Sequence, residues 1–156
     1  YVTSVGDSAI TIGAGYSATE GAKTGDQMTA DEGGIHFGIS AVTGDLTVAV
    51  GFADGDSIEN TNAVQSDGEF VGVGLKYVSG DLTFNVGAKS GTSKDSTTIG
   101  TAGTTEDAED SVSASVSYAV ASGVTAILGY TDIDAEDEGA ASTDGSAWYI
   151  GANMSF

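Results

Sequence analysis

Apolar residues alternate with small or polar residues along eight segments of the chain. These segments lie near 9–18, 34–42, 46–53, 70–78, 82–90, 111–120, 124–131 and 147–156. Alternation with a period of two is typical of β-strands, in which successive side chains point to opposite faces. Each segment is therefore predicted to be a strand with one apolar and one polar face.

Short turns rich in Gly, Asp and Ser join pairs of these segments. Residues 41–51, 77–87 and 118–127 read almost as copies, each with a small turn between two β-branched runs. Such turns are a strong signal of a β-hairpin. A looser copy at 1–13 predicts a fourth hairpin, and its alignment with 77–87 indicates that Tyr1 ends a further strand of a longer chain.

The connections between the hairpins are long and polar. They lie at about 19–33, 54–69, 91–110 and 132–146. Of the 23 acidic residues, 20 fall in these stretches, the others fall in short turns, and none is expected inside a strand. Short turns at one rim and long loops at the other are typical of outer-membrane β-barrels, whose long loops are extracellular.

Aromatic residues of the apolar parity gather at both ends of the segments. Rings at the two borders of an apolar band are favoured because they lie at the headgroup level of a bilayer. A soluble β-sandwich also has alternating strands, but a packed core gives no reason for this placement. The expected aromatic girdle consists of Tyr16, Phe52, Tyr77, Tyr118, Tyr130, Trp148 and Phe156.

The pattern as a whole predicts an all-β fold, an antiparallel transmembrane β-barrel with eight full strands, in which residues 1–156 form a single domain. The 24 glycines and few bulky residues fit poorly with a soluble core. The absence of cysteine excludes disulfides, thiolate metal sites and cysteine nucleophiles. A net charge of -19 with only four basic residues argues against nucleic acid as a partner.

The polar parity is expected to face a water-filled lumen. His36 lies between Ile35 and Phe37, and a single histidine forms neither a catalytic pair nor a three-ligand metal site. Lys76 and Lys89 are the only lysines expected in strands. Either they line the passage and set its potential, or they pair with acids of a folded-in loop. The expected pore-lining residues are His36, Lys76, Asn85, Lys89 and Asn153.

The acidic segment 132–138 raises the question of calcium. It lacks the central Gly and terminal Glu of an EF-hand loop, so a solvated acidic loop is the default interpretation. The functional alternative is weak calcium binding by Asp132, Asp134, Glu136 and Asp137, with bridging to lipopolysaccharide phosphate. No other metal or cofactor is expected. Because the chain contains neither a Gly-x-Ser-x-Gly motif nor a phosphate-binding loop, it is interpreted as non-enzymatic.

The C-terminal segment 148–156 resembles the terminal strand signature of Gram-negative outer-membrane proteins. Phe156 is last, Met154 lies two residues before it, and Gly151 lies five before it. In that family the barrel assembly machinery reads this segment, so the resemblance implies the same role for these three residues. The alternative is an ordinary strand that happens to end in Phe.

The whole chain is similar to the C-terminal half of general diffusion porins of the alphaproteobacterial type, which share acidic loops, scarce lysine and strands rich in Gly, Ala and Ser. The resemblance implies a homotrimer of barrels with about sixteen strands. It also implies passive diffusion of small hydrophilic solutes and ions across the outer membrane, in contact with lipid and lipopolysaccharide.

The acidic mouth adds an expected preference for cations. If the chain is complete, the alternative is a non-conducting eight-stranded barrel that acts as an adhesin or surface-interaction protein through its acidic loops.

Overall fold

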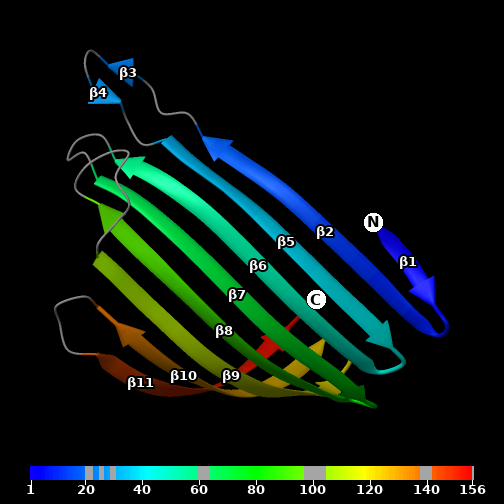
Figure 1. The fold of residues 1–156 in the computed structure, drawn as a ribbon. Helices are drawn as coiled ribbons and strands as arrows, with labels where there is room; N and C mark the ends of the chain where they lie inside the picture. Colours follow the sequence, from blue (N-terminus) through cyan, green and yellow to red (C-terminus); the bar gives the residue numbers. More distant parts are fainter. Residues whose placement is uncertain are drawn as a thin grey trace.

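The described residues form one antiparallel sheet and a small ribbon. The computed structural model describes residues 1–19, 23–24, 27–28, 31–59, 64–96, 105–137 and 142–155. The sheet is 9-stranded with the order β1-β2-β5-β6-β7-β8-β9-β10-β11, so each of its strands pairs with the sheet strands before and after it along the chain (Figure 1). In the described ranges, no helix has the length and hydropathy needed to cross a bilayer.

All eight expected strands are present, which confirms the fold predicted from the alternation. The β3–β4 ribbon and the short β1 accompany them. The bounds are β1 Val2–Val5, β2 Ser8–Thr19, β3 Lys23–Thr24, β4 Gln27–Met28, β5 Asp31–Thr43, β6 Leu46–Glu59, β7 Val64–Ser79, β8 Leu82–Ser96, β9 Thr105–Ala121, β10 Val124–Glu136 and β11 Thr143–Met154.

Two-residue turns close the four predicted hairpins. Gly6, Gly44, Gly80 and Gly123 have φ angles of 60°, 55°, 59° and 75°. Tight hairpin turns whose twist matches the strands need a positive φ, and glycine adopts it without steric cost. These turns define one rim of the sheet, which we call the short-turn rim. The strand ends that flank the long connections lie at the opposite rim, which we call the long-connection rim.

The strands are longer than expected at the long-connection rim, and the expectation that no acid lies inside a strand is wrong. Asp56, Asp67 and Asp134, for example, lie in β6, β7 and β10 and occupy regular ladder positions. β9 contains 17 residues, which at a rise of about 3.4 Å and a tilt of about 45° cover roughly 40 Å of height. An apolar band about 25 Å tall therefore leaves strand ends in water, where acidic side chains are tolerated.

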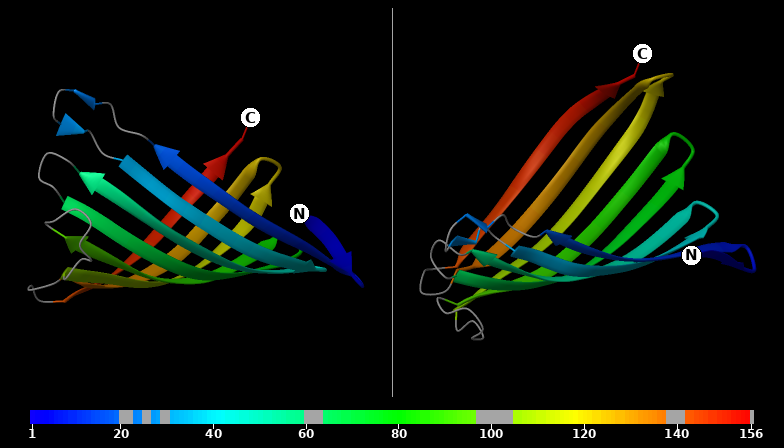
Figure 2. Two further views of the ribbon diagram at one scale, coloured as in Figure 1. Left: turned by 45° about the horizontal axis from the view of Figure 1, so that its top comes forward. Right: turned by 90° about the horizontal axis from the view of Figure 1, so that it is seen from above.

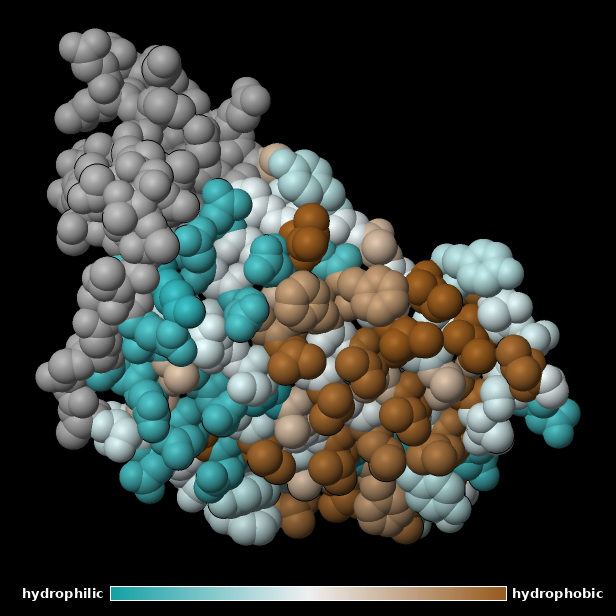
Figure 3. All heavy atoms as spheres, in the orientation of Figure 1, coloured by the Kyte–Doolittle hydropathy of each residue, from teal (hydrophilic) through white to brown (hydrophobic). Residues whose placement is uncertain are grey.

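The sheet is strongly curved, and the curvature separates the two faces (Figure 2). From β2 to β11 it bends into a trough whose convex side carries the apolar side chains (Figure 3). β1 and β11 are its two edges, and within the described residues they do not pair with each other.

Candidate channel wall

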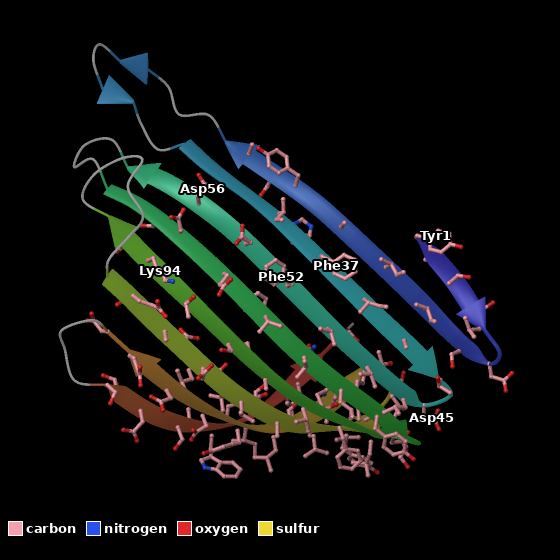
Figure 4. All side chains as sticks on the ribbon, viewed as in Figure 1. Tyr1, Phe37, Asp45, Phe52, Asp56 and Lys94 are labelled. Carbon is pink, nitrogen blue, oxygen red and sulfur yellow. The ribbon has the colours of Figure 1, made fainter. Side chains whose placement is uncertain are left out.

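The strand register places the apolar parity of every strand on one face. Phe37 lies opposite Phe52, and Val48 lies opposite Leu75, so apolar neighbours meet across successive strands. Figure 4 shows Phe37 and Phe52 on the same face, with Asp56 and Lys94 nearer the long-connection rim. The convex face therefore has an apolar band next to a polar region.

This apolar band has no protein core to cover it. No apolar side chain is buried among the residues whose exposure the structure describes, and large apolar residues such as Ile150 are up to 86% exposed. A contiguous exposed apolar surface of this size is typical of a membrane or protein contact. Because the band crosses every strand from β2 to β11, a bilayer is the partner that fits its whole extent.

The border of the band that faces the long-connection rim runs obliquely to the hydrogen-bonded rows of the sheet. The row that starts at Phe52 in β6 continues through Val71 and Ser90 to Asp110 and Asp134. One row therefore begins as apolar and ends as acidic. Strands of a membrane barrel are tilted by about 35–45°, so a membrane plane must cut their hydrogen-bonded rows obliquely. The slanted border follows that plane.

The predicted girdle residues lie at the two borders of the band. Tyr77 and Tyr118 lie toward the short-turn rim, where each faces an apolar partner on the next strand. The other described members lie at the long-connection border, where the rings of Tyr130 and Trp148 have centroids 4.7 Å apart. Phe156 lies outside the described residues. The described members of the long-connection group are Tyr16, Phe52, Tyr130 and Trp148.

Beyond the band, acidic side chains of the outward parity form what we call the acidic belt. Several of them face one another directly across strands, as Asp54 faces Glu69 and Asp110 faces Asp134. The Tyr130 hydroxyl donates a hydrogen bond of 2.7 Å to Asp132 and so joins the girdle to the belt. The acidic belt consists of Asp54, Asp56, Asp67, Glu69, Glu106, Asp110, Asp132, Asp134, Glu136 and Asp144.

Three of the four candidate calcium ligands belong to this belt and not to a loop. Asp132, Asp134 and Glu136 lie in β10 on one face, and Asp137 directly follows the strand. Within the described ranges, no three His, Asp or Glu side chains are arranged to hold a metal ion. The extended strand spaces alternate side chains apart and separates the acids that a closed loop would gather.

The concave face is hollow and carries the polar parity. A hollow of about 790 Å³ is lined by residues of strands from β2 to β10, among them Ser17, His36, Phe70, Lys89 and Glu109. Side chains from so many adjacent strands share one space only on the inner side of a curved sheet. The glycines of this face, such as Gly38 opposite Gly51, leave the space open.

The predicted pore-lining residues lie on this concave face. His36 of β5 is opposite Gly15 of β2, and Asn153 of the edge strand β11 is opposite Thr125 of β10. Asn85 donates a side-chain hydrogen bond of 3.2 Å to the hydroxyl of Ser115. The structure thus holds Asn85 in a polar cross-strand pair and leaves His36 and Asn153 exposed.

The strand lysines differ in their ion pairs and in the face of the sheet on which they lie. Lys89 forms an ion pair with Glu109 of the adjacent strand β9, on the concave face. Within the described residues, Lys76 makes no ion pair. Lys76 and Lys89 are not the only strand lysines, because Lys23 lies in the short β3, and Lys94 lies in β8 and pairs with Glu106 at 3.1 Å on the convex face. Strand β8 extends beyond the apolar band and carries Lys94 with it.

Several residues of the wall escaped the sequence analysis. Glu109 was assigned to a loop because acids seemed incompatible with strands. Phe37 joins the long-connection border opposite Phe52. Tyr149 is inward and lies over Gly129. The sequence could have shown this, because Tyr149 directly follows the outward Trp148 and adjacent side chains in a strand face opposite sides.

The curved sheet, the exposed apolar band and the hollow, polar concave face together define the class of an outer-membrane β-barrel protein. A family model described as Gram-negative porin matches residues 1–156. The chain therefore belongs to the Gram-negative porin family, and it is an outer-membrane protein with a porin-like barrel fold.

Solved structures show the same fold. OmpT of Vibrio cholerae, expressed in the outer membrane, is similar with a TM-score of 0.65 and 20% identity, over 98% of this chain and 53% of that one. A loop L8 deletion mutant of OmpT, an outer membrane protein of Vibrio cholerae, is similar with a TM-score of 0.64 and 18% identity. This match covers 98% of this chain and 51% of that one. The chain thus spans about half the length of these structures. No curated protein matches the chain.

The interpretation of the chain as non-enzymatic requires correction. It relied on missing motifs in a segment that covers only 51% and 53% of the OmpT chains it resembles. A site inside a barrel can combine side chains from both halves of the wall. Motifs absent from one half therefore do not exclude catalysis, and the exclusion is withdrawn.

Proposed function

We propose that this chain forms part of the wall of a water-filled channel for the passive diffusion of small hydrophilic solutes and ions. The observation that carries the proposal is the open concave face. Its hollow of about 790 Å³ is lined mostly by small and polar residues, while the opposite face of the same strands is apolar. Such a wall keeps lipid outside and water inside.

The proposed channel prefers cations. Acidic side chains outnumber basic ones on both faces near the long-connection rim, and Glu109 neutralises the inward Lys89. A wall with this excess of negative charge attracts cations by a potential of several kT at low ionic strength. We also propose that the long-connection rim is extracellular, which places the acidic belt at the outer surface beside lipopolysaccharide.

The remaining architecture is proposed from the family resemblance and the length of the related structures. The chain is a single transmembrane domain and the C-terminal half of an alphaproteobacterial-type porin of about sixteen strands. Three copies form a homotrimer, and the barrel assembly machinery reads Gly151, Met154 and Phe156. The acidic segment around Asp132 and Asp134 is a solvated surface without a resident metal, and weak calcium bridging to lipopolysaccharide is its functional alternative.

Planar bilayer recording of the full-length protein that contains this segment tests the function. We expect discrete conductance steps and, under a potassium chloride gradient, a reversal potential that corresponds to cation preference. Reversal toward chloride would contradict the selectivity alone. A folded protein that inserts without conducting would overturn the channel and favour the surface-interaction alternative.

A further inference from the structure

Three rings on the concave face lie directly over glycines. His36 and Tyr149 are the cross-strand partners of Gly15 and Gly129. A Cβ atom built on Gly15 would overlap the His36 ring, and one built on Gly129 would overlap the Tyr149 ring. Phe70 makes the same arrangement within one strand, because its Cζ would lie 3.0 Å from a Cβ at Gly72.

The Tyr149 ring lies over a buried glycine. Gly129 is the one buried residue among those whose exposure the structure describes. Tyr149 itself remains 50% exposed. A ring that covers the backbone on one side and is open to solvent on the other lies flat on the wall.

A flat ring has a direct consequence for a channel. It adds about one van der Waals layer, roughly 3.5 Å, to the wall, whereas a ring that stands upright projects further into the lumen. A ring packed over a strand glycine also replaces the missing side-chain contacts of that glycine. The glycine therefore determines how far the neighbouring ring projects.

We propose that Gly15, Gly72 and Gly129 are seats that hold His36, Phe70 and Tyr149 against the wall, and that these seats set the free cross-section of the lumen. This inference rests on the proposed channel function. The seated rings are positioning elements of the wall, and the glycines act through them.

The test compares Gly→Ala changes at seats and at open glycines of the same strand or of the adjacent strand that carries the ring. Gly129→Ala has the control Gly145→Ala, because Gly145 has nothing within 4 Å of an added Cβ. Gly15→Ala has the control Gly13→Ala for the same reason. Single-channel conductance of the full-length protein is measured for each variant. We expect a loss of conductance at both seats and wild-type conductance at both controls.

Removal of the ring provides the second arm. Tyr149→Ala introduced into Gly129→Ala is expected to restore the conductance to the wild-type value or above it, since no ring is left to project. Equal conductance in Gly129→Ala and Gly145→Ala, or no recovery in the double variant, would overturn the seats while leaving the channel proposal intact. Wild-type protein without conductance would overturn both. If Gly129→Ala does not fold, the Gly15→Ala and Gly13→Ala pair decides the outcome.

Discussion

Neighbouring residues of β7 lie in opposite environments. Val71 and Val73 point to the convex face, where Val71 lies opposite Phe52 and Val73 lies between Val50 and Ala88. Gly72 and Gly74 point to the concave face, where Gly72 lies between Gly51 and Lys89, and Gly74 lies between Ala49 and Gly87. The convex face of β7 thus carries large apolar side chains, whereas its concave face carries glycines that leave the enclosed space open.

The comparison shows that solvation shapes this fold from both sides. A soluble sheet buries its apolar parity against another layer. Here that parity stays exposed among the described residues, and the polar parity lines a hollow. The strands are held by their ladder hydrogen bonds and by lipid outside, so small residues inside carry no packing penalty.

The largest expected effect comes from a charge placed on the convex face. Val73 is 52% exposed near the middle of the apolar band. Val73→Arg is expected to lower the free energy of unfolding by about 2–4 kcal/mol, because an arginine at the bilayer midplane loses its hydration. Urea titration of the full-length protein refolded in lipid vesicles measures this change.

Gly74→Arg is the matched control for Val73→Arg. Gly74 is the next residue in β7, faces the concave side and has open space around an added Cβ. Its substitution is expected to alter stability by no more than about 0.5 kcal/mol, as for other solvated positions. Equal destabilisation by the two arginines would contradict the assignment of the faces.

The strands and their faces could be predicted from the alternation because a period of two directly reports side-chain direction. The ends of the strands could not be predicted from the sequence. Asp67 and Glu106 have low β-propensity, yet they lie in β7 and β9, because ladder pairing with already formed neighbours outweighs local preference. The Lys89–Glu109 pair was missed for the same reason, since it depends on the register of those extended ends.

A smaller effect is expected at the long-connection border of the band. The Tyr130 and Trp148 rings contact each other with an interplanar angle of 48°. A double-mutant cycle of Tyr130→Ala and Trp148→Ala is expected to give a coupling free energy of about 0.5–1.5 kcal/mol, typical of tilted aromatic pairs. Additive losses of stability in the same vesicle titration would show that the two rings contact lipid independently.

The smallest effect on stability is expected from loss of either of the two ion pairs between β8 and β9. Lys89–Glu109 lies on the concave face, and Lys94–Glu106 lies on the convex face. All four side chains are about half exposed, so Lys89→Gln or Lys94→Gln is expected to alter the free energy of unfolding by less than about 1 kcal/mol. Stability measurements therefore give similar values for the two variants.

Ion selectivity separates the same two variants. Lys89→Gln leaves Glu109 unneutralised beside the lumen, so the cation-to-anion permeability ratio is expected to rise by up to about fivefold, which corresponds to roughly 1 kcal/mol between solvated charges. Lys94→Gln frees Glu106 on the outer side of the wall, where salt screens it from permeating ions, and the ratio stays at the wild-type value. Reversal potentials in dilute potassium chloride measure both ratios. A shift of equal size in the two variants would mean that the ions do not distinguish the concave face from the convex one.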